Sequence, residues 1–184
     1  MPVVLARIDQ RFIHGQILAS GALARRRVTG VIVADRALCG DETRKRIFDG
    51  ALTAADPPVR RGAVYVDPSR ICELLDAREV AAERYLAIFG DMAGVLAALD
   101  AGAALDALNL GNFCSSADDR SELYQGFTAG PSEIAELDEL ARRVRQIYFG
   151  PLDDPHMCYR PHAPSPGRPP CPGPGGQPGR PRGA

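Results

Sequence analysis

The sequence has no tryptophan, only three histidines and no apolar run that approaches the length of a membrane span. A membrane-spanning helix needs about 20 consecutive apolar residues, so we expect none. No charged and apolar leader precedes the first apolar run at residues 3–5, which argues against a secretory signal peptide. These absences favour a cytoplasmic protein.

The cysteines also lack a pattern. There are five, an odd number, and their spacing is not that of a metal site. We expect free thiols in a reducing compartment. His156 and His162 flank Cys158, but no predicted helix fixes their geometry and no second pair supports them, so we do not predict a metal site. We expect neither a metal nor an organic cofactor.

An excess of positive charge is likewise absent. Lysine and arginine number 22 against 23 aspartates and glutamates, for a net charge of −1. This balance gives no basic surface for nucleic acid. With 45% hydrophobic and 24% charged residues, 184 residues suit one globular domain with a substantial core.

We place the domain at residues 1–154 and a Pro/Gly-rich tail at 155–184. Residues 161–184 contain nine prolines, six glycines and no acidic residue. Proline cannot continue a helix, and so little apolar content cannot offset the entropy cost of ordering, so we predict that the tail is disordered. A basic docking tail and an altered reading frame in the gene both fit this composition.

The body alternates short apolar runs with segments of helical periodicity. This alternation predicts an α/β fold, a doubly wound and mainly parallel sheet with helices on both faces. A helix opening at Asp41 is expected to bury Ile47, Phe48, Ala51 and Leu52. The predicted strands are 3–5, 31–33, 64–66, 85–89 and 105–110, followed by a polar loop at 112–123, a short strand at 124–127, a helix from Pro131 and a final strand at 144–149.

The first predicted strand runs into the decapeptide Arg7-Ile8-Asp9-Gln10-Arg11-Phe12-Ile13-His14-Gly15-Gln16, and helical periodicity resumes at Ile17. Open α/β sheets bind ligands at the carboxyl ends of their strands, where this loop falls. Gly15 lets the backbone approach a bound group, and a helix N-terminus attracts anions. A histidine that titrates near neutrality, beside an arginine, suits transfer of a phosphoryl group.

The decapeptide resembles the phosphorylation loop of the EIIB component of the mannose/fructose/sorbose family of the sugar phosphotransferase system. That loop typically reads Arg-Ile-Asp-Asp-Arg-Leu-Ile-His-Gly-Gln, so eight of ten positions match and Gln10 and Phe12 depart. Asp35, the segment 43–45 and Asn109-Leu110-Gly111-Asn112 also resemble family segments. The resemblance covers about residues 3–153 and implies one antiparallel strand near the end. It stops where the family usually has a further helix.

The resemblance implies a phosphotransferase that accepts a phosphoryl group on His14 from an EIIA partner. The group then passes to a sugar held by the membrane subunits EIIC and EIID, which implies peripheral attachment to the inner face of the membrane. Arg11 would act with His14 in catalysis by neutralising phosphoryl charge. Gly15, Gln16, Asp9 and Arg7 complete the predicted phosphate-binding set, with Asp9 orienting the loop and a structural role open for Arg7. The family's phosphorylated nitrogen is Nδ1.

Other interpretations stay open. The same histidine could serve a regulatory phosphoprotein without sugar transport, or it could be inert in an α/β binding module. Residues 90–94 lack the glycine spacing of a dinucleotide fingerprint. Cys114 is expected to pack rather than act as a nucleophile. The identity of the sugar and the existence of a homodimer are left open.

Overall fold

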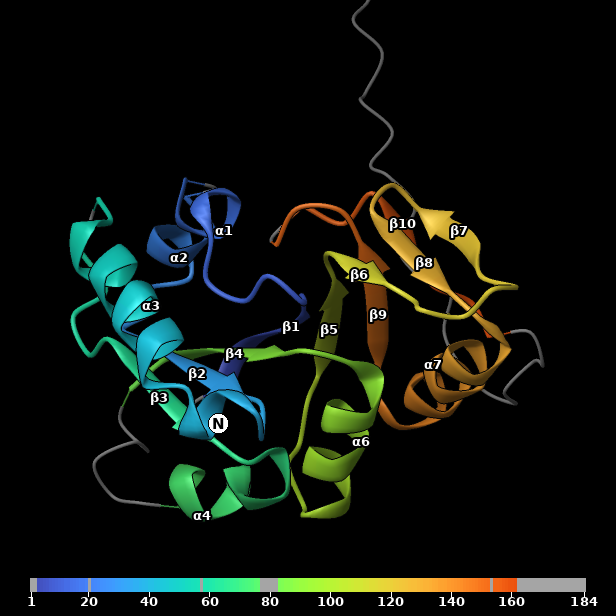
Figure 1. The fold of residues 1–184 in the computed structure, drawn as a ribbon, viewed down its shortest axis with the longest axis horizontal. Coiled ribbons are helices and arrows are strands. Elements are labelled where there is room, and N and C mark those ends of the chain that lie inside the picture. The colour runs from blue at the N-terminus through green and yellow to red at the C-terminus, as the bar shows by residue number, and fades with distance from the viewer. Residues whose placement is uncertain (1–2, 20, 57, 77–82, 153, 162–184) are drawn as a thin grey trace, which may run out of the picture.

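The fold comes from a computed structural model, which describes residues 3–19, 21–56, 58–76, 83–152 and 154–161. A seven-stranded sheet runs through the middle of the molecule (Figure 1). Its strands are parallel except for one edge strand, β10, so the predicted mainly parallel sheet is confirmed. In sheet order the strands are β10 (Met157–Cys158), β9 (Gln146–Phe149), β5 (Ala107–Leu110), β1 (Val3–Ile8), β4 (Tyr85–Phe89), β2 (Gly30–Ala34) and β3 (Ala63–Val66).

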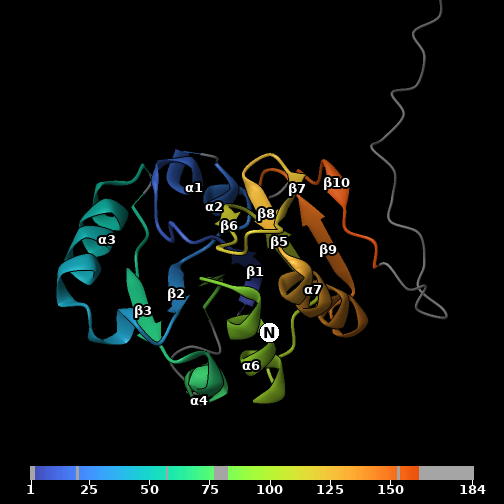
Figure 2. The same ribbon diagram turned by 45° about the vertical axis from the view of Figure 1, so that its right-hand side comes forward.

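Helices cover both faces of this sheet, as the two views show (Figure 1, Figure 2). One face packs against α1 (Gly15–Ala19), α2 (Ala22–Arg25) and α3 (Glu42–Ala54). The other packs against α4 (Ile71–Leu75), α6 (Met92–Asp100) and α7 (Pro131–Arg143). Two short 3-10 turns, η1 (Leu38–Gly40) and η2 (Pro68–Arg70), precede α3 and α4.

Strand β2 shows why the central strands read as unbroken apolar runs. Successive side chains of a strand point to opposite faces. Val31 and Val33 therefore pack with α3, whereas Ile32 and Ala34 join the core on the opposite face. Because helices cover both faces, every residue of β2 is buried and no alternation with polar residues is needed.

Strand β1 lies where the chain changes direction in the sheet. The chain leaves β1 for β2 and β3 on one side, then returns through β4 and crosses to β5 and β9 on the other. Strands β4 and β5 thus flank β1. Ligands of open α/β sheets bind at such a switch point, outside the carboxyl ends of the strands. The loop after β1 has this position.

A small second sheet corrects the prediction for residues 112–127. Its strands β6 (Phe113–Cys114), β8 (Phe127–Ala129) and β7 (Ser121–Tyr124) lie in that order. Strands β7 and β8 form an antiparallel hairpin, so the predicted loop at 112–123 and single strand at 124–127 were wrong. The hairpin turns at Gly126, whose φ of 76° favours glycine.

Two helix predictions also change. The helix expected from Ile17 is two short helices, α1 and α2, and Gly21 with φ 70° precedes the second. In α3, Phe48 and Leu52 are buried as expected, but the Ile47 side chain is 63% exposed. Residues 48 and 52 are four apart and share a helix face, whereas residue 47 is turned about 100° away from Phe48.

The packed chain extends past the boundary predicted at residue 154. Strand β10 pairs with β9, and Tyr159 is only 6% exposed and belongs to the core. The Tyr159 hydroxyl donates to Asp138 Oδ1 at 2.7 Å. Residues 155–161 are therefore part of the fold, contrary to the prediction. The rest of the predicted tail, 162–184, lies outside the described residues.

Candidate functional site

The loop after β1 begins with a tight turn. The backbone N–H of Phe12 donates to the Asp9 carbonyl at 3.0 Å, and Phe12 has a positive φ of 55°. A bulky residue seldom adopts this conformation, because it is strained. Packing holds it there, since Phe12 is 4% exposed and lies 6.3 Å from the Phe48 ring, with the Arg44 guanidinium 5.6 Å above it. Phe12 thus anchors the loop to α3.

The buried carboxylate of Asp9 is the centre of the site. Its side chain is 0% exposed and accepts hydrogen bonds from Arg7 Nε at 3.0 Å, Arg7 Nη2 at 2.8 Å and the Arg11 backbone N–H at 3.0 Å. His14 Nε2 lies 3.0 Å from Asp9 Oδ2. Burial alone would raise the pKa of Asp9, but the hydrogen bond with His14 and the charge of Arg7 outweigh it and lower the pKa to about 2. Asp9 is therefore an anion at neutral pH.

Arg7 lies behind this carboxylate, away from solvent. It is 7% exposed, and its Nη1 donates to the Asn109 side-chain oxygen. The register of the two strands explains this contact, because Arg7 of β1 is paired with Asn109 of β5. Gly111 leaves room for the guanidinium, since a Cβ there would lie 2.3 Å from Arg7 Cζ. We did not predict a role for Asn109, although an amide in the apolar strand Ala-Leu-Asn-Leu was a usable signal.

The imidazole of His14 is fixed by Asp9. An ionised carboxylate can only accept hydrogen bonds, so His14 Nε2 must carry the proton. In neutral His14 the lone pair then belongs to Nδ1, for which the described residues provide no hydrogen-bond partner. The side chain is 16% exposed. The site thus presents one nucleophilic nitrogen.

Arg11 and Gln16 lie on the outer side of the loop. The Arg11 side chain is 44% exposed, with Nε 3.4 Å from Asp9 Oδ1, and its Nη2 donates to Gln16 Oε1 at 3.0 Å. Gly15 and Gln16 open α1, and their N–H groups precede the first helical hydrogen bond, from Ile17 N–H to His14 O. The predicted phosphate-binding set is thus divided by burial. Arg11, Gly15 and Gln16 lie at the outer surface of the loop, whereas Arg7 and Asp9 are buried beneath it.

Gln10 connects the loop to the second sheet. Its side-chain oxygen accepts from the Cys114 backbone N–H at 2.9 Å, and its amide nitrogen lies 3.4 Å from the Cys114 carbonyl. Its backbone N–H donates to Asn112 O at 2.8 Å. Gln10, where the loop departs from the resemblance, thus pairs with a backbone segment far along the chain.

Two cavities flank the loop at this edge of the sheet. One, of about 510 Å³, lies beside Gln10 and Phe12 and is lined by Asp35, Asp91 and Glu136. The pKa of Glu136 is raised, first by burial and then by its acidic neighbours. The other, of about 780 Å³, contains Arg11 and Gln16 in its wall. The loop thus separates an acidic cavity from a basic one.

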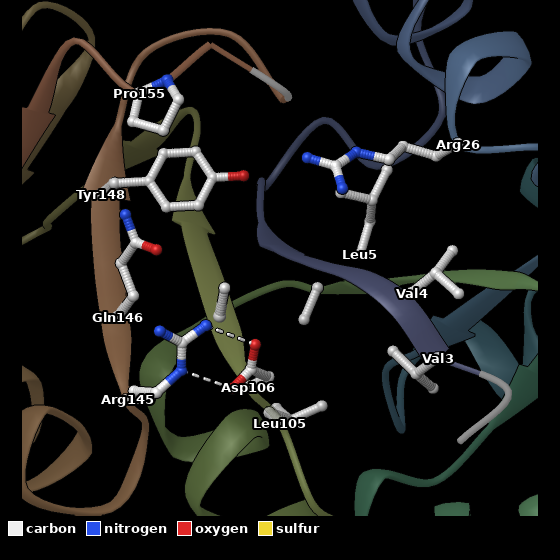
Figure 3. A pocket seen from close by; sticks show the side chains of 12 residues that line it. Val3, Val4, Leu5, Arg26, Leu105, Asp106, Arg145, Gln146, Tyr148 and Pro155 are labelled. Atoms are coloured by element: carbon white, nitrogen blue, oxygen red, sulfur yellow. Dashed lines mark hydrogen bonds and ion pairs between the residues drawn. The ribbon is translucent and has the colours of Figure 1, made fainter. Parts of the chain in front are cut away.

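A third cavity, of about 210 Å³, lies away from the loop (Figure 3). Strand β1 pairs with β5 only at Arg7–Asn109 and Ile8–Leu110, so their earlier residues diverge and leave a wedge. At its rim Arg145 forms an ion pair with Asp106 at 2.7 Å. These charges lie near the starts of β5 and β9, each of which begins two residues later than predicted.

A family model decides the relationship of the chain to known proteins. The model described as the sorbose-subfamily IIB component of the PTS system matches residues 3–149. The chain belongs to this family. It is therefore a IIB component of the sugar phosphotransferase system, and the resemblance of the decapeptide pointed to the right family.

Individual relatives agree with this assignment. This chain is 30% identical over 111 residues to the fructose-specific EIIB component of Bacillus subtilis. The match spans 60% of this chain and 64% of that protein. The IIB domain of the sorbose permease from Klebsiella pneumoniae superposes with a TM-score of 0.73 at 21% identity, covering 86% of this chain and 93% of that one. An N-acetylgalactosamine-specific IIB component from Escherichia coli gives 0.71 at 15% identity, covering 86% and 98%. These two likenesses concern the fold.

Of the two remaining histidines, the structure describes only His156. His156, expected in or beside a flexible segment, has its Nδ1 2.8 Å from the Tyr124 hydroxyl. His162 lies outside the described residues. Within the described ranges, no group of three or more His, Cys, Asp or Glu side chains could hold a metal ion. No helix in those ranges is long and apolar enough to span a bilayer.

Proposed function

We propose that this IIB component is a phosphocarrier that accepts a phosphoryl group on His14 Nδ1 from an EIIA partner. It would then transfer the group to a sugar during uptake through membrane EIIC and EIID subunits. The observation that carries the proposal is the contact between His14 Nε2 and the buried anion Asp9 at 3.0 Å. It supports an imidazole with its proton on Nε2, which leaves the nucleophilic lone pair on Nδ1.

This geometry provides the nucleophile for the first transfer step. The Nδ1 lone pair attacks the phosphorus held by the donor, and the donor's own P–N bond breaks with its electron pair returning to the donor imidazole. The Nε2 proton stays in place, and the Asp9 carboxylate stabilises the positive charge that develops on the ring. In the second step a sugar hydroxyl oxygen attacks the phosphorus, the P–Nδ1 bond breaks with its electron pair returning to the His14 ring, and the hydroxyl proton is released to solvent.

Charge balance supports the assignment of Arg11. A single buried carboxylate, Asp9, faces two guanidiniums, so the loop keeps a surplus of positive charge. Arg7 is buried against Asp9 and Asn109, whereas Arg11 is 44% exposed and can turn toward a ligand. We assign Arg11 to the phosphoryl oxygens, with the N–H groups of Gly15 and Gln16, and Arg7 and Asp9 to positioning.

The deciding experiment is phosphoryl transfer from purified phosphorylated EIIA to the full chain. Wild type and the double variant His156→Ala/His162→Ala should be labelled, and folded His14→Ala should not. The label should be lost in acid and retained in alkali, as expected for a phosphoramidate rather than a serine ester. Label that persists on folded His14→Ala would refute the assignment. Normal labelling without delivery to sugar, in the presence of EIIC and EIID, would instead favour the regulatory alternative.

A further inference from the structure

The side chain of Gln10 pairs with the backbone of Cys114 as a neighbouring strand would. Its Oε1 accepts from the Cys114 N–H at 2.9 Å, and its Nε2 donates to the Cys114 carbonyl oxygen at 3.4 Å. The backbone N–H of Gln10 adds a third hydrogen bond, to Asn112 O at 2.8 Å. A primary amide both donates and accepts, so it can bond to the N–H and the C=O of one residue together. We call this pair the Gln10–Cys114 clamp.

The pairing of β6 with β8 explains why the Cys114 backbone is directed at the loop. The N–H groups of Phe113 and Ser115 donate to backbone carbonyl oxygens within residues 126–128. Backbone groups of successive residues in a strand point to opposite edges, so those of Cys114 point away from β8. Gln10 therefore occupies the place of a further strand at this edge of the second sheet.

Strand β6 is a firm support for the clamp. Phe113 is 5% exposed, and its ring centroid lies 5.3 Å from that of Phe127. Ser115 is also buried, and its hydroxyl donates to Glu133 Oε1 at 2.9 Å. Glu133 lies in the first turn of α7 and accepts from the Gly130 N–H at 2.8 Å. The clamp thus ties the loop to the core of the second sheet and to α7.

Gln10 and Arg11 are the two central residues of a tight turn. The hydrogen bond from the Phe12 N–H to Asp9 O, at 3.0 Å, closes this turn of four residues. The Arg11 side chain is 44% exposed, and its Nε lies at the longer distance of 3.4 Å from Asp9 Oδ1. The direction of the guanidinium therefore depends strongly on the backbone of the turn. A rotation at Gln10 would move Arg11 with it.

We propose that Gln10 is a positioning residue for phosphoryl transfer, because the clamp fixes the turn that directs Arg11 toward a phosphoryl group on His14. This inference rests on the proposed function and deepens it. The loop that the decapeptide resembles has aspartate at this position. An aspartate carboxylate donates no hydrogen bond, and its side chain is one methylene shorter, so it would not reproduce the clamp. The contact is specific to the sequence of this chain.

The first test of the clamp needs no phosphoryl donor. Gln10→Met keeps the length of the side chain and removes its amide. Amide hydrogen exchange, followed by NMR, should become about tenfold faster at Cys114 in this variant, because one hydrogen bond to its N–H is lost. Exchange at Phe113 and Ser115 should stay unchanged, because their N–H groups bond to the hairpin. Equal exchange at Cys114 in wild type and variant would refute the clamp.

The second test measures single-turnover transfer from phosphorylated EIIA over a range of EIIA concentrations. Gln10→Met should lower the maximal rate about tenfold, the kinetic equivalent of one hydrogen bond. The half-saturating EIIA concentration should stay within about twofold, because the defect concerns the geometry of the reacting groups. Gln125→Met is the matched control, since it changes an exposed glutamine at the turn of the β7–β8 hairpin, and it should transfer at the wild-type rate. Melting temperatures verify that the variants fold.

A double-variant cycle separates positioning from a general loss of structure. In an Arg11→Ala background, Gln10→Met should slow transfer by no more than about twofold, because the clamp acts through Arg11. A full tenfold loss in that background, or a wild-type maximal rate in Gln10→Met alone, would overturn the positioning role. Failure of EIIA to label wild type on His14 would refute the proposed function, and the role of Gln10 with it. The exchange data distinguish the two failures, because they report the clamp whether or not the chain is labelled.

Discussion

At the scale of single residues, Asp9 decides which ring nitrogen of His14 carries a proton. The carboxylate has no exposed surface, and its hydrogen bonds hold its pKa at about 2. It fixes the proton on Nε2 and forms a buried ion pair with Arg7. The same residue therefore contributes both to stability and to the chemistry of the loop.

This coupling predicts a pH-dependent effect of Asp9→Asn. The variant leaves Arg7 without its anion, so we expect a loss of about 3 kcal/mol of unfolding free energy at pH 7. The pKa of Asp9 is lower in the folded state, so its contribution is complete above about pH 4 and disappears as the pH falls toward 2. Urea unfolding of both proteins across this range should show the difference shrinking with acidification. A constant difference would contradict the proposed ion pair.

The two arginines of the loop should differ in which property they affect. Arg11→Ala should slow transfer from EIIA by about 10²- to 10³-fold, the effect of removing one transition-state donor, with little change in melting temperature. Arg11→Lys should recover part of the rate, because lysine lacks the planar fork. Arg7→Ala should instead lower stability, because it leaves Asp9 buried without its main partner. Wild-type rates in Arg11→Ala would move the phosphoryl-binding role to Arg7.

At the scale of elements, the site depends on the pairing of β1 with β5. Their register brings Arg7 to Asn109, and Gly111 just past β5 makes room for the guanidinium. The other strand beside β1 contributes differently, since Phe89 O in β4 accepts from the Asp9 N–H at 2.9 Å. The loop is thus positioned from both sides by the sheet.

Two glycine-to-alanine variants test this arrangement. A Cβ at Gly111 would displace Arg7 from Asp9 and Asn109, so Gly111→Ala should cost about 1–3 kcal/mol of stability and slow transfer. A Cβ at Gly15 would meet no atom within 4 Å, so Gly15→Ala should fold normally. If phosphoryl oxygens approach Gly15, its transfer rate should still fall. Melting curves and labelling rates of the two variants separate the effects; an unchanged stability in Gly111→Ala would contradict the packing described.

At the scale of the whole molecule, we propose that one folded unit ends near residue 160. Tyr159 packs against Phe149 with ring centroids 6.5 Å apart, and β10 extends the sheet beyond β9. The residues that follow are dominated by proline and glycine and show no pattern of core residues.

Two truncations test this boundary. Removing residues 162–184 should leave the melting temperature and His14 labelling essentially unchanged, because that segment has little apolar surface to bury. Removing residues 155–184 deletes β10 and the buried Tyr159, and it should cost about 3 kcal/mol. Thermal unfolding of both proteins is the measurement. A large loss of stability in the shorter truncation would mean that the tail packs on the body.

The sequence by itself determined the fold class, most of the strands and the residues of the candidate loop after β1. Buried strands in a sheet covered on both faces are continuous apolar runs, so β1, β2, β3 and β4 can be read locally. The loop was readable for a similar reason, because its chemistry lies within ten consecutive residues. Whether His14 is phosphorylated stays a prediction.

Tertiary structure decided what depends on distant contacts. Asn109 reaches Arg7 across 102 positions and Gln10 reaches Cys114 across 104, because strand order makes β1 and β5 neighbours. The division between Arg7 and Asp9 behind the loop and Arg11 in front of it follows from burial, which the spacing of the residues does not encode. His156 lies beside Tyr124 only because β10 returns along β9. Local patterns specify elements, but the side chains that meet are set by how those elements pack.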